Sequence, residues 1–270
     1  MTTASSPRTA ALAAGGVLVV LYATTLAPDV TFWDAGEFIA AAKTLGIPHP
    51  PGTPLFVMIA HVWAMIFPIG EYAVRTNLLS ALLSATGVGF FFLIAHESIR
   101  AFTTDLEERP ARLLRLGGAA AAAMLGAFTF TNWQNSNETE VYAVATFSIA
   151  AMSWLAHVWR RYRGTERAPR VLLLIVYLAG VSIGNHLLAL LAGPAVIMFM
   201  ASTLRSAPAA DPIRRRAEWA QVPISSAHTP ATTATCAHST RRRIGSAAGA
   251  LRSVLTMNMI TAGPASSASK

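Results

Sequence analysis

Hydrophobic residues gather in long runs along the first 205 residues, and short polar connections separate these runs. The runs cover 10–27, 54–69, 76–98, 113–131, 141–159 and 171–204. Runs of about 18 or more residues with few charges are typical of helices that cross a membrane. The pattern therefore predicts an all-α, multi-pass transmembrane protein whose membrane module occupies residues 1–205.

The run at 54–69 is better explained as a helix lying along the membrane surface. It is at the short end of spanning length, contains His61 and is bounded by prolines. Thr53 followed by Pro54 is typical of a helix N-cap and first turn, so a short helix is expected there in either orientation. We therefore predict that 54–69 belongs to the first outer loop and does not cross the membrane.

The distribution of basic residues supports this assignment. With 54–69 outside the set of spans, the outer loops 29–75 and 132–140 hold only Lys43 and Arg75. The inner loops and helix ends hold nine arginines: Arg100, Arg109, Arg112, Arg115, Arg160, Arg161, Arg163, Arg167 and Arg170. Excess Lys and Arg mark the inner side of a membrane protein. Because 171–204 is too long for one span, a turn at 184–186 is expected, which gives six spans.

Residues 206–270 form a second region of different composition, rich in Ala, Ser, Thr, Pro and Arg. Residues 205–270 contribute +7 of the formal net charge of +8, so the basic character says little about partners of the membrane module. No nucleic-acid partner is expected. We expect a low-complexity tail that is disordered or read out of frame. The sole cysteine, Cys236, excludes an intrachain disulfide.

The first outer loop carries the residues best suited to chemistry. Asp34 and Glu37 stand among aromatic residues, including Trp33, and on a helix their spacing puts both carboxylates on one face. Near a membrane surface one carboxylate could act as a general base. The same spacing also fits a capping box, which requires no catalysis. From the motif alone, both interpretations stay open.

Other polar residues could complete a site or could have structural roles. The proline-rich segment 47–54 either holds His49 over the acidic pair or simply reverses the chain. The polar loop 132–140 ends in Glu140, which is also well placed for a helix N-terminus. Asn185 and His186 interrupt a hydrophobic run, which predicts either a functional role or hydrogen bonds between helices.

Three segments in this order resemble one family of membrane proteins. They are Asp34 to Ile39 with Gly46 to Phe56, Trp133 to Tyr142, and Gly180 to His186. The family is a former domain of unknown function among the GT-C glycosyltransferases, and it includes O-mannosyltransferases of plexin-type receptors. The resemblance covers about residues 20–205. It implies a GT-C-like helical module with juxtamembrane helices in the first outer loop.

The resemblance also implies a reaction and a set of site residues. A sugar, with mannose the candidate, would pass with inversion from a polyprenyl-phosphate donor to an acceptor hydroxyl on the outer face. Asp34 corresponds to the catalytic acid, with Glu37 beside it. The residues implied in substrate binding are Trp33, Lys43, His49, Arg75, Glu140, Asn185 and His186. No metal and no cofactor is expected, and a protein is the candidate acceptor.

The expected partners are the lipid bilayer and the lipid-linked donor, and the expected location is a bacterial inner membrane with the active loop on its outer side. The resembling family continues beyond the membrane module and has a seventh span, so a truncated inactive fragment is one alternative. A non-catalytic membrane scaffold is another. A transporter is disfavoured because the sequence lacks an internal repeat and ionisable residues deep in several spans.

Overall fold

The computed structural model describes residues 6–206, apart from the side chains of residues 189 and 190, and within them every element is helical. Most of the tail predicted at 206–270 lies outside the described residues. In chain order the elements are α1 (Pro7–Thr24), α2 (Ala35–Thr44), α3 (Pro54–Ile66), α4 (Tyr72–Arg100), α5 (Glu108–Ala127), α6 (Phe130–Asn137), α7 (Val141–Tyr162), α8 (Arg167–Ile183), η1 (Leu187–Leu191) and α9 (Ala192–Arg205).

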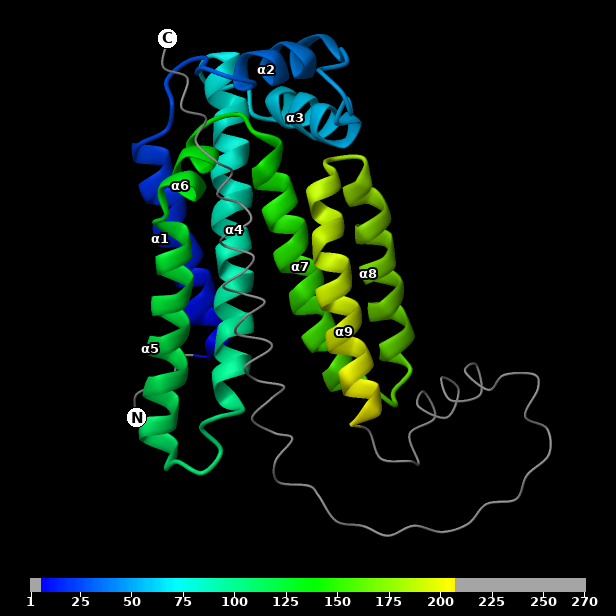
Figure 1. Cartoon of the computed structure of the whole chain (residues 1–270). Helices are drawn as coiled ribbons and strands as arrows, with labels where there is room; N and C mark the ends of the chain where they lie inside the picture. Colours follow the sequence, from blue (N-terminus) through cyan, green and yellow to red (C-terminus); the bar gives the residue numbers. More distant parts are fainter. Residues whose placement is uncertain (1–5, 207–270) are drawn as a thin grey trace, which may run out of the picture.

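Six helices run side by side, and two short ones lie across one end of this bundle (Figure 1). The six are α1, α4, α5, α7, α8 and α9, and the crossing pair is α2 and α3. We call the end that carries α2, α3 and α6 the outer end, following the predicted orientation, and the opposite end the inner end. The arrangement confirms the predicted multi-pass helical architecture and the exclusion of 54–69 from the bundle.

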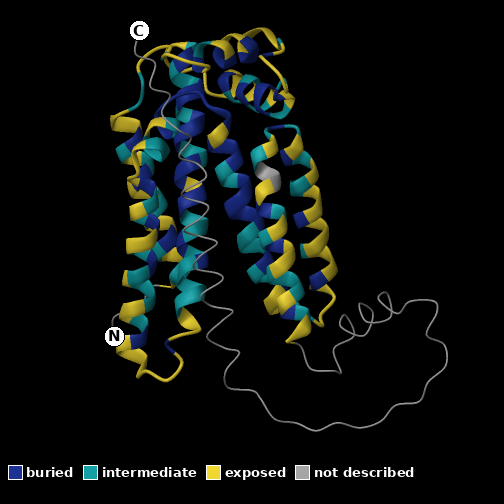
Figure 2. Ribbon diagram, viewed as in Figure 1, coloured by how far each residue is buried: buried dark blue, intermediate teal, exposed yellow. Residues whose placement is uncertain are grey.

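Helix α4 is the centre of the bundle, where it packs against α1, α5 and α7 (Figure 2). Its contact face with α1 and α5 is rich in small residues, including Ala81 and Ala85. Small residues let membrane helices approach closely. A Cβ added to Gly15 of α1 would lie 3.3 Å from the Ala85 carbonyl oxygen, so the two backbones nearly touch.

The helices differ in how well they meet the requirements for crossing a membrane. Helices α1, α4 and α7 are long and apolar enough. Helices α5 and α6 qualify together, but the chain bends by 69° between them, so the run predicted at 113–131 is not one straight helix. Helices α8 and α9 have 17 and 14 residues, which is shorter than a usual span. The count of six spans therefore stays a prediction.

The crossing pair is held on the bundle by an aromatic and aliphatic cluster. Phe56 of α3 packs edge-on against Phe38 of α2, with 5.5 Å between ring centroids, and both are buried with Leu79 of α4 and Val144 of α7. Burying a side chain of this size contributes about 1.5–3 kcal/mol. The first outer loop is therefore a packed cap on the bundle.

Asn77 of α4 joins the first loop to the second loop beneath this cap. Its amide donates to the backbone oxygens of Ala27, at 2.9 Å, and Asp29, at 3.3 Å. Its side-chain oxygen accepts a hydrogen bond from the Thr139 hydroxyl. Asn77 is buried, so each of these bonds satisfies a group that water does not reach.

Replacing Asn77 with alanine is expected to lower the unfolding temperature of the chain in detergent. The change removes the hydrogen bonds to the Ala27 and Asp29 oxygens and the bond from the Thr139 hydroxyl, which keeps its bond to Thr76, and each lost bond costs about 0.5–1.5 kcal/mol. Thr86→Ala is the matched control, because the Thr86 hydroxyl is exposed on the same helix and bonds only to the Leu82 oxygen within it. Equal unfolding temperatures for both variants would contradict the joining role of Asn77.

Candidate active site

A turn leads into α2, and in this turn the Asp34 side chain does not cap the helix. Trp33 has a φ of 68°, in the left-handed region that non-glycine residues rarely adopt, and its ring is 82% exposed. Asp34 then takes the N-cap position of α2, yet its side chain makes no capping hydrogen bond. An exposed carboxylate thus stands at the outer end of the molecule.

Glu37 binds His49, which comes from the proline-rich turn that follows α2. One carboxylate oxygen of Glu37 accepts from the His49 backbone N–H at 2.6 Å, and the other lies 2.8 Å from its ring Nδ1. The capping-box interpretation is therefore wrong, because Glu37 turns to a residue 12 positions away and not to its own helix start. The alternative for 47–54, that it holds His49 at the acidic pair, is confirmed.

The pairing changes the protonation of both residues in the direction of an ion pair. The hydrogen bond from His49 lowers the pKa of Glu37, and the hydrogen bond to Glu37 raises the pKa of His49. The negative charge of Asp34 raises the pKa of His49 further. Both shifts favour an ion pair between the His49 ring and the Glu37 carboxylate.

Replacing Glu37 with glutamine is expected to lower the pKa of His49, because the amide keeps the shape but removes the charge and one strong acceptor. The His49 ring then loses its proton at a lower pH than in the parent chain. The measurement is the titration of the His49 ring by NMR, with Glu71→Gln at the same end as the control. An unchanged titration in Glu37→Gln would show that the pair does not determine the charge of His49.

Asp34, Glu37 and His49 form a compact group of donor atoms. One atom from each lies within 4.8 Å of the other two, and all three residues are exposed. Two carboxylate oxygens and an imidazole nitrogen match the donors of several divalent metals. His49 Nδ1 is, however, already hydrogen-bonded to Glu37. The expectation that no metal is needed stays a prediction.

Glu140 from the second outer loop adds a buried acid to the site. It occupies the N-cap position of α7, is 6% exposed, and its Oε2 atom is buried without a hydrogen-bond partner. Burial, followed by the charges of Glu138 and Asp34, raises the pKa of Glu140 to about 8. At neutral pH this carboxyl is therefore mainly protonated and can donate a hydrogen bond.

The third segment of the resemblance, Gly180 to His186, reaches the outer end of the bundle at the turn after α8. Asn185 is fully buried and donates to the Val141 backbone oxygen at 3.1 Å, while its own oxygen has no partner. The Gly184 oxygen accepts from the Leu55 N–H of α3 at 2.9 Å. The turn predicted at 184–186 is confirmed, and it ties α3 and α7 together at the outer end.

His186 is placed beside the site by an aromatic neighbour. Its ring lies 5.5 Å from that of Tyr142, centroid to centroid, and its Nδ1 accepts from the Leu188 N–H at 3.1 Å. Burial lowers the pKa of His186, and the positive charge of His49 lowers it further. The pKa values of His186 and His49 are thus shifted in opposite directions.

Two basic residues implied by the resemblance lie away from this group. Lys43 is in the last turn of α2, about 14 Å along the helix from Asp34, and its ammonium lies 5.9 Å from the Tyr72 ring centre. The Arg75 guanidinium donates to the backbone oxygens of Gly70 and Ala64. His49 is the basic side chain that directly adjoins Asp34.

Sequence reasoning missed Asn77 and Tyr142. Asn77 stands inside the hydrophobic run 76–98, where a polar residue is costly, so the reasoning that singled out Asn185 would also have found it. Tyr142 carries no such signal, because a tyrosine at a helix start near a membrane surface is common.

A hollow of about 480 Å³ opens next to the first loop. It is lined by Thr25, Ala27, Thr31, Phe128, Phe130, Trp133, Gln134, Asn137 and Glu138. Thr31 is three residues before Asp34, so this wall of the hollow lies at most about 11 Å from the Asp34 backbone. The Trp133 ring is held by Tyr22 at 5.1 Å and Phe128 at 5.5 Å between centroids. The hollow therefore has a firm aromatic wall.

Comparison with known proteins identifies the family. Residues 34–208 match the family described as "Protein O-mannosyl-transferase TMEM260 N-terminal domain". The protein O-mannosyl-transferase TMEM260 of Mus musculus is 27% identical over 173 residues, which cover 63% of this chain and 22% of the relative. Its namesake from Dictyostelium discoideum is 23% identical over 146 residues, 53% of this chain and 16% of the relative. No solved structure matches.

The chain thus spans about a fifth of the length of these curated relatives. Both relatives come from eukaryotes, so the expected location in a bacterial inner membrane has no support from the comparisons, whereas the apolar helices do indicate a membrane protein. The family match covers more than half of the chain and includes all three segments of the site. This chain belongs to the TMEM260 N-terminal domain family.

Proposed function

We propose that this chain carries the catalytic loop of a membrane mannosyltransferase that acts on protein hydroxyl groups. The observation that carries the proposal is the Asp34 carboxylate, which is exposed, makes no capping bond and lies within 4.8 Å of the Glu37–His49 pair. The curated relatives are protein O-mannosyl-transferases, which supports both the sugar and the protein acceptor.

Asp34 is the general base in the proposed reaction. It accepts the proton of a serine or threonine hydroxyl, and the oxygen attacks the anomeric carbon of mannose. The bond from that carbon to the phosphate oxygen breaks, and the polyprenyl phosphate leaves with the electron pair. Attack from the side opposite the leaving group inverts the anomeric configuration. Base catalysis of this kind contributes about 10²- to 10⁴-fold to a rate.

His49 donates to the departing phosphate, and Glu37 positions it. An imidazolium that gives a charge-assisted hydrogen bond stabilises the negative charge that develops on the leaving oxygen. The two bonds from Glu37 hold both the backbone and the ring of His49 in place. Glu37 then acts through His49 and does not itself touch the sugar.

The aromatic hollow beside Thr31 receives the acceptor polypeptide. Its Trp133 and Phe128 rings offer apolar surface, and Gln134 and Glu138 offer hydrogen-bonding groups to a peptide backbone. Thr31 belongs both to the wall of the hollow and to the segment that leads to Asp34, so an acceptor chain that lies in the hollow can continue toward the base. The site lies opposite the arginine-rich end, which supports the extracytoplasmic side for the reaction.

The test is a transfer assay with labelled polyprenyl-phosphate mannose and a peptide rich in serine and threonine. Membranes that contain the chain are compared with membranes from the same host without it. Mannose linked to the peptide in the first and not in the second supports the proposal. Equal labelling of the peptide in both would overturn it for this chain.

A further inference from the structure

The inner end of the bundle carries many arginines, and three of them pair with the same acidic residue. The Glu97 carboxylate, largely buried at the end of α4, lies 2.8 Å from Arg161, 3.7 Å from Arg160 and 3.8 Å from Arg100. These three guanidinium groups share one counter-charge within the protein. The arginines at the start of α8 are outside this cluster.

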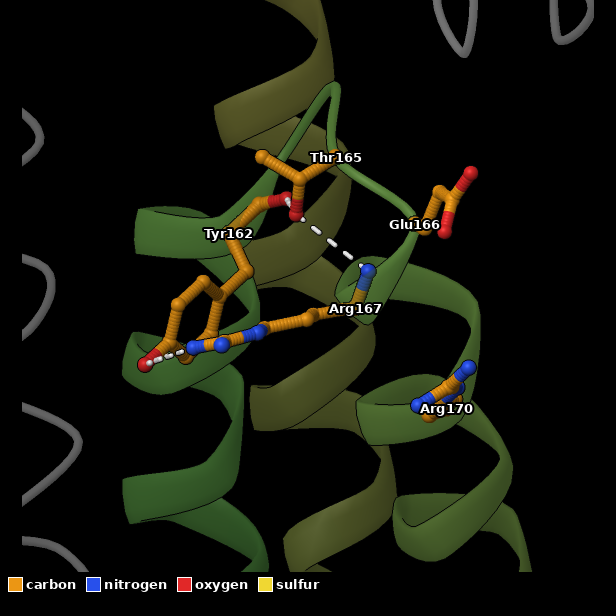
Figure 3. A pocket seen from close by; sticks show the side chains of 5 residues that line it. All are labelled: Tyr162, Thr165, Glu166, Arg167 and Arg170. Carbon is orange, nitrogen blue, oxygen red and sulfur yellow. Dashed lines mark hydrogen bonds between the residues drawn. The ribbon is translucent and has the colours of Figure 1, made fainter.

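A separate hollow of about 400 Å³ lies where α7 ends and α8 begins (Figure 3). It is lined by Tyr162, Thr165, Glu166, Arg167 and Arg170. The Arg167 guanidinium lies 5.3 Å from the Tyr162 ring centre, with a long contact of 3.5 Å to the phenol oxygen. The Arg167 backbone N–H donates to the Thr165 hydroxyl at 3.3 Å. The hollow is therefore shaped by contacts between its own walls.

The two arginines of the hollow keep an uncompensated positive charge. Among residues 6–206, no ion pair involves Arg167, and neither a hydrogen bond nor an ion pair involves Arg170. Figure 3 shows the Glu166 carboxylate turned away from the Arg167 guanidinium. The hollow lies at the N-terminal end of α8, where the helix dipole favours an anion.

An exposed apolar surface continues from the hollow along α8. Leu173, Val176 and Tyr177 are 60–69% exposed. Leu173 and Tyr177 follow Arg170 at spacings of three and seven, which places all three on one face of the helix. A positive group followed by an apolar stripe along one helix matches a phospholipid, with its phosphate at the membrane surface and its chains in the bilayer.

We propose that the hollow between α7 and α8 binds the phosphate of an anionic phospholipid, whose acyl chains lie along the exposed face of α8. Arg167 and Arg170 supply charge-assisted hydrogen bonds to the phosphate oxygens. The site is at the opposite end of the bundle from Asp34. The proposed lipid site does not depend on whether the chain transfers sugar.

The test measures lipid binding to the purified full chain by native mass spectrometry, with phosphatidylglycerol and phosphatidylcholine as probes. The parent chain is expected to bind phosphatidylglycerol more tightly than phosphatidylcholine. The double variant Arg167→Gln/Arg170→Gln is expected to lose about tenfold in affinity for phosphatidylglycerol alone. The single variant Arg170→Gln is expected to show part of this loss, and it leaves the contacts of Arg167 with Tyr162 intact.

The matched control is Arg8→Gln/Arg109→Gln, which removes the same charge from exposed arginines elsewhere at the inner end. Retained binding in this control, together with loss in the hollow variants, supports the proposal. An equal loss in the control would overturn it, because general surface charge would then explain the binding. Glycerol 3-phosphate that binds as tightly as phosphatidylglycerol would overturn the role of the acyl chains and of α8.

Discussion

Replacing Asp34 with asparagine is expected to lower the rate of mannose transfer by about 10²- to 10⁴-fold, the usual contribution of a positioned general base. The amide has the size of the carboxylate but does not accept the hydroxyl proton. Asp34 makes no capping bond, so the change is expected to leave α2 and the unfolding temperature nearly unaltered. The measurement is label transferred per unit time at saturating donor and acceptor.

Asp29→Asn is the matched control for this experiment. Asp29 is an acid of the same loop, but one of its carboxylate oxygens accepts from the Val30 N–H at 2.7 Å, and it does not belong to the group formed by Asp34, Glu37 and His49. Its rate is expected to stay within about twofold of the parent chain, as for a surface substitution. Asp34→Asn at the parent rate would refute the assignment of Asp34 as the base.

The large features of the fold could be predicted because they depend on the order of hydrophobic and charged residues, which the sequence shows directly. The side on which arginine accumulates was enough to remove 54–69 from the spans, and α3 does lie across the bundle end. The break at 128–129, where α5 ends and α6 turns away by 69°, could not be predicted from hydropathy. The apolar residues simply continue through it, and the bend depends on packing against α4.

The candidate site could be predicted in its parts but not in its bonds. Asp34, Glu140 and Asn185 were singled out by residue type, and the structure brings their segments to one end of the bundle. The partner of Glu37 could not be inferred, because local spacing favoured a capping box while the real partner, His49, arrives through a turn. Side chains joined across a loop leave no periodic signal in the sequence.

Two acids of similar chemistry thus have opposite environments in the same site. Asp34 is exposed at a helix start, whereas Glu140 is buried and its pKa is raised to about 8. Environments of this kind separate the roles of two acids, because burial keeps a proton on Glu140, which can donate it, and leaves Asp34 as the proposed base. The unpartnered Oε2 of Glu140 leaves a hydrogen-bonding position open for a sugar or phosphate oxygen.

Transfer by the parent chain is therefore expected to fall as the pH rises through about 8, where the folded Glu140 ionises. The protonated form is present below that value and declines about tenfold for each pH unit above it. Glu140→Gln, which stays neutral, is expected to keep most of the rate and to lose the part of the alkaline fall that Glu140 causes, so that only the part caused by deprotonation of His49 remains. Glu140→Ala removes the donor altogether and is expected to cost about 10²-fold below pH 8, where the parent carboxyl is protonated.

Unfolding measured over the same pH range separates this role from a purely structural one. Between 4.5, the ordinary pKa, and about 8, the folded chain holds a proton on Glu140 that the unfolded chain releases. Stability is therefore expected to fall as the pH rises through this window, and Glu140→Gln removes the fall. Glu138→Gln removes a neighbouring charge, so it should lower the pKa of Glu140 and move the fall in transfer to lower pH. An alkaline fall that persists unchanged in Glu140→Gln would assign the titration to another group.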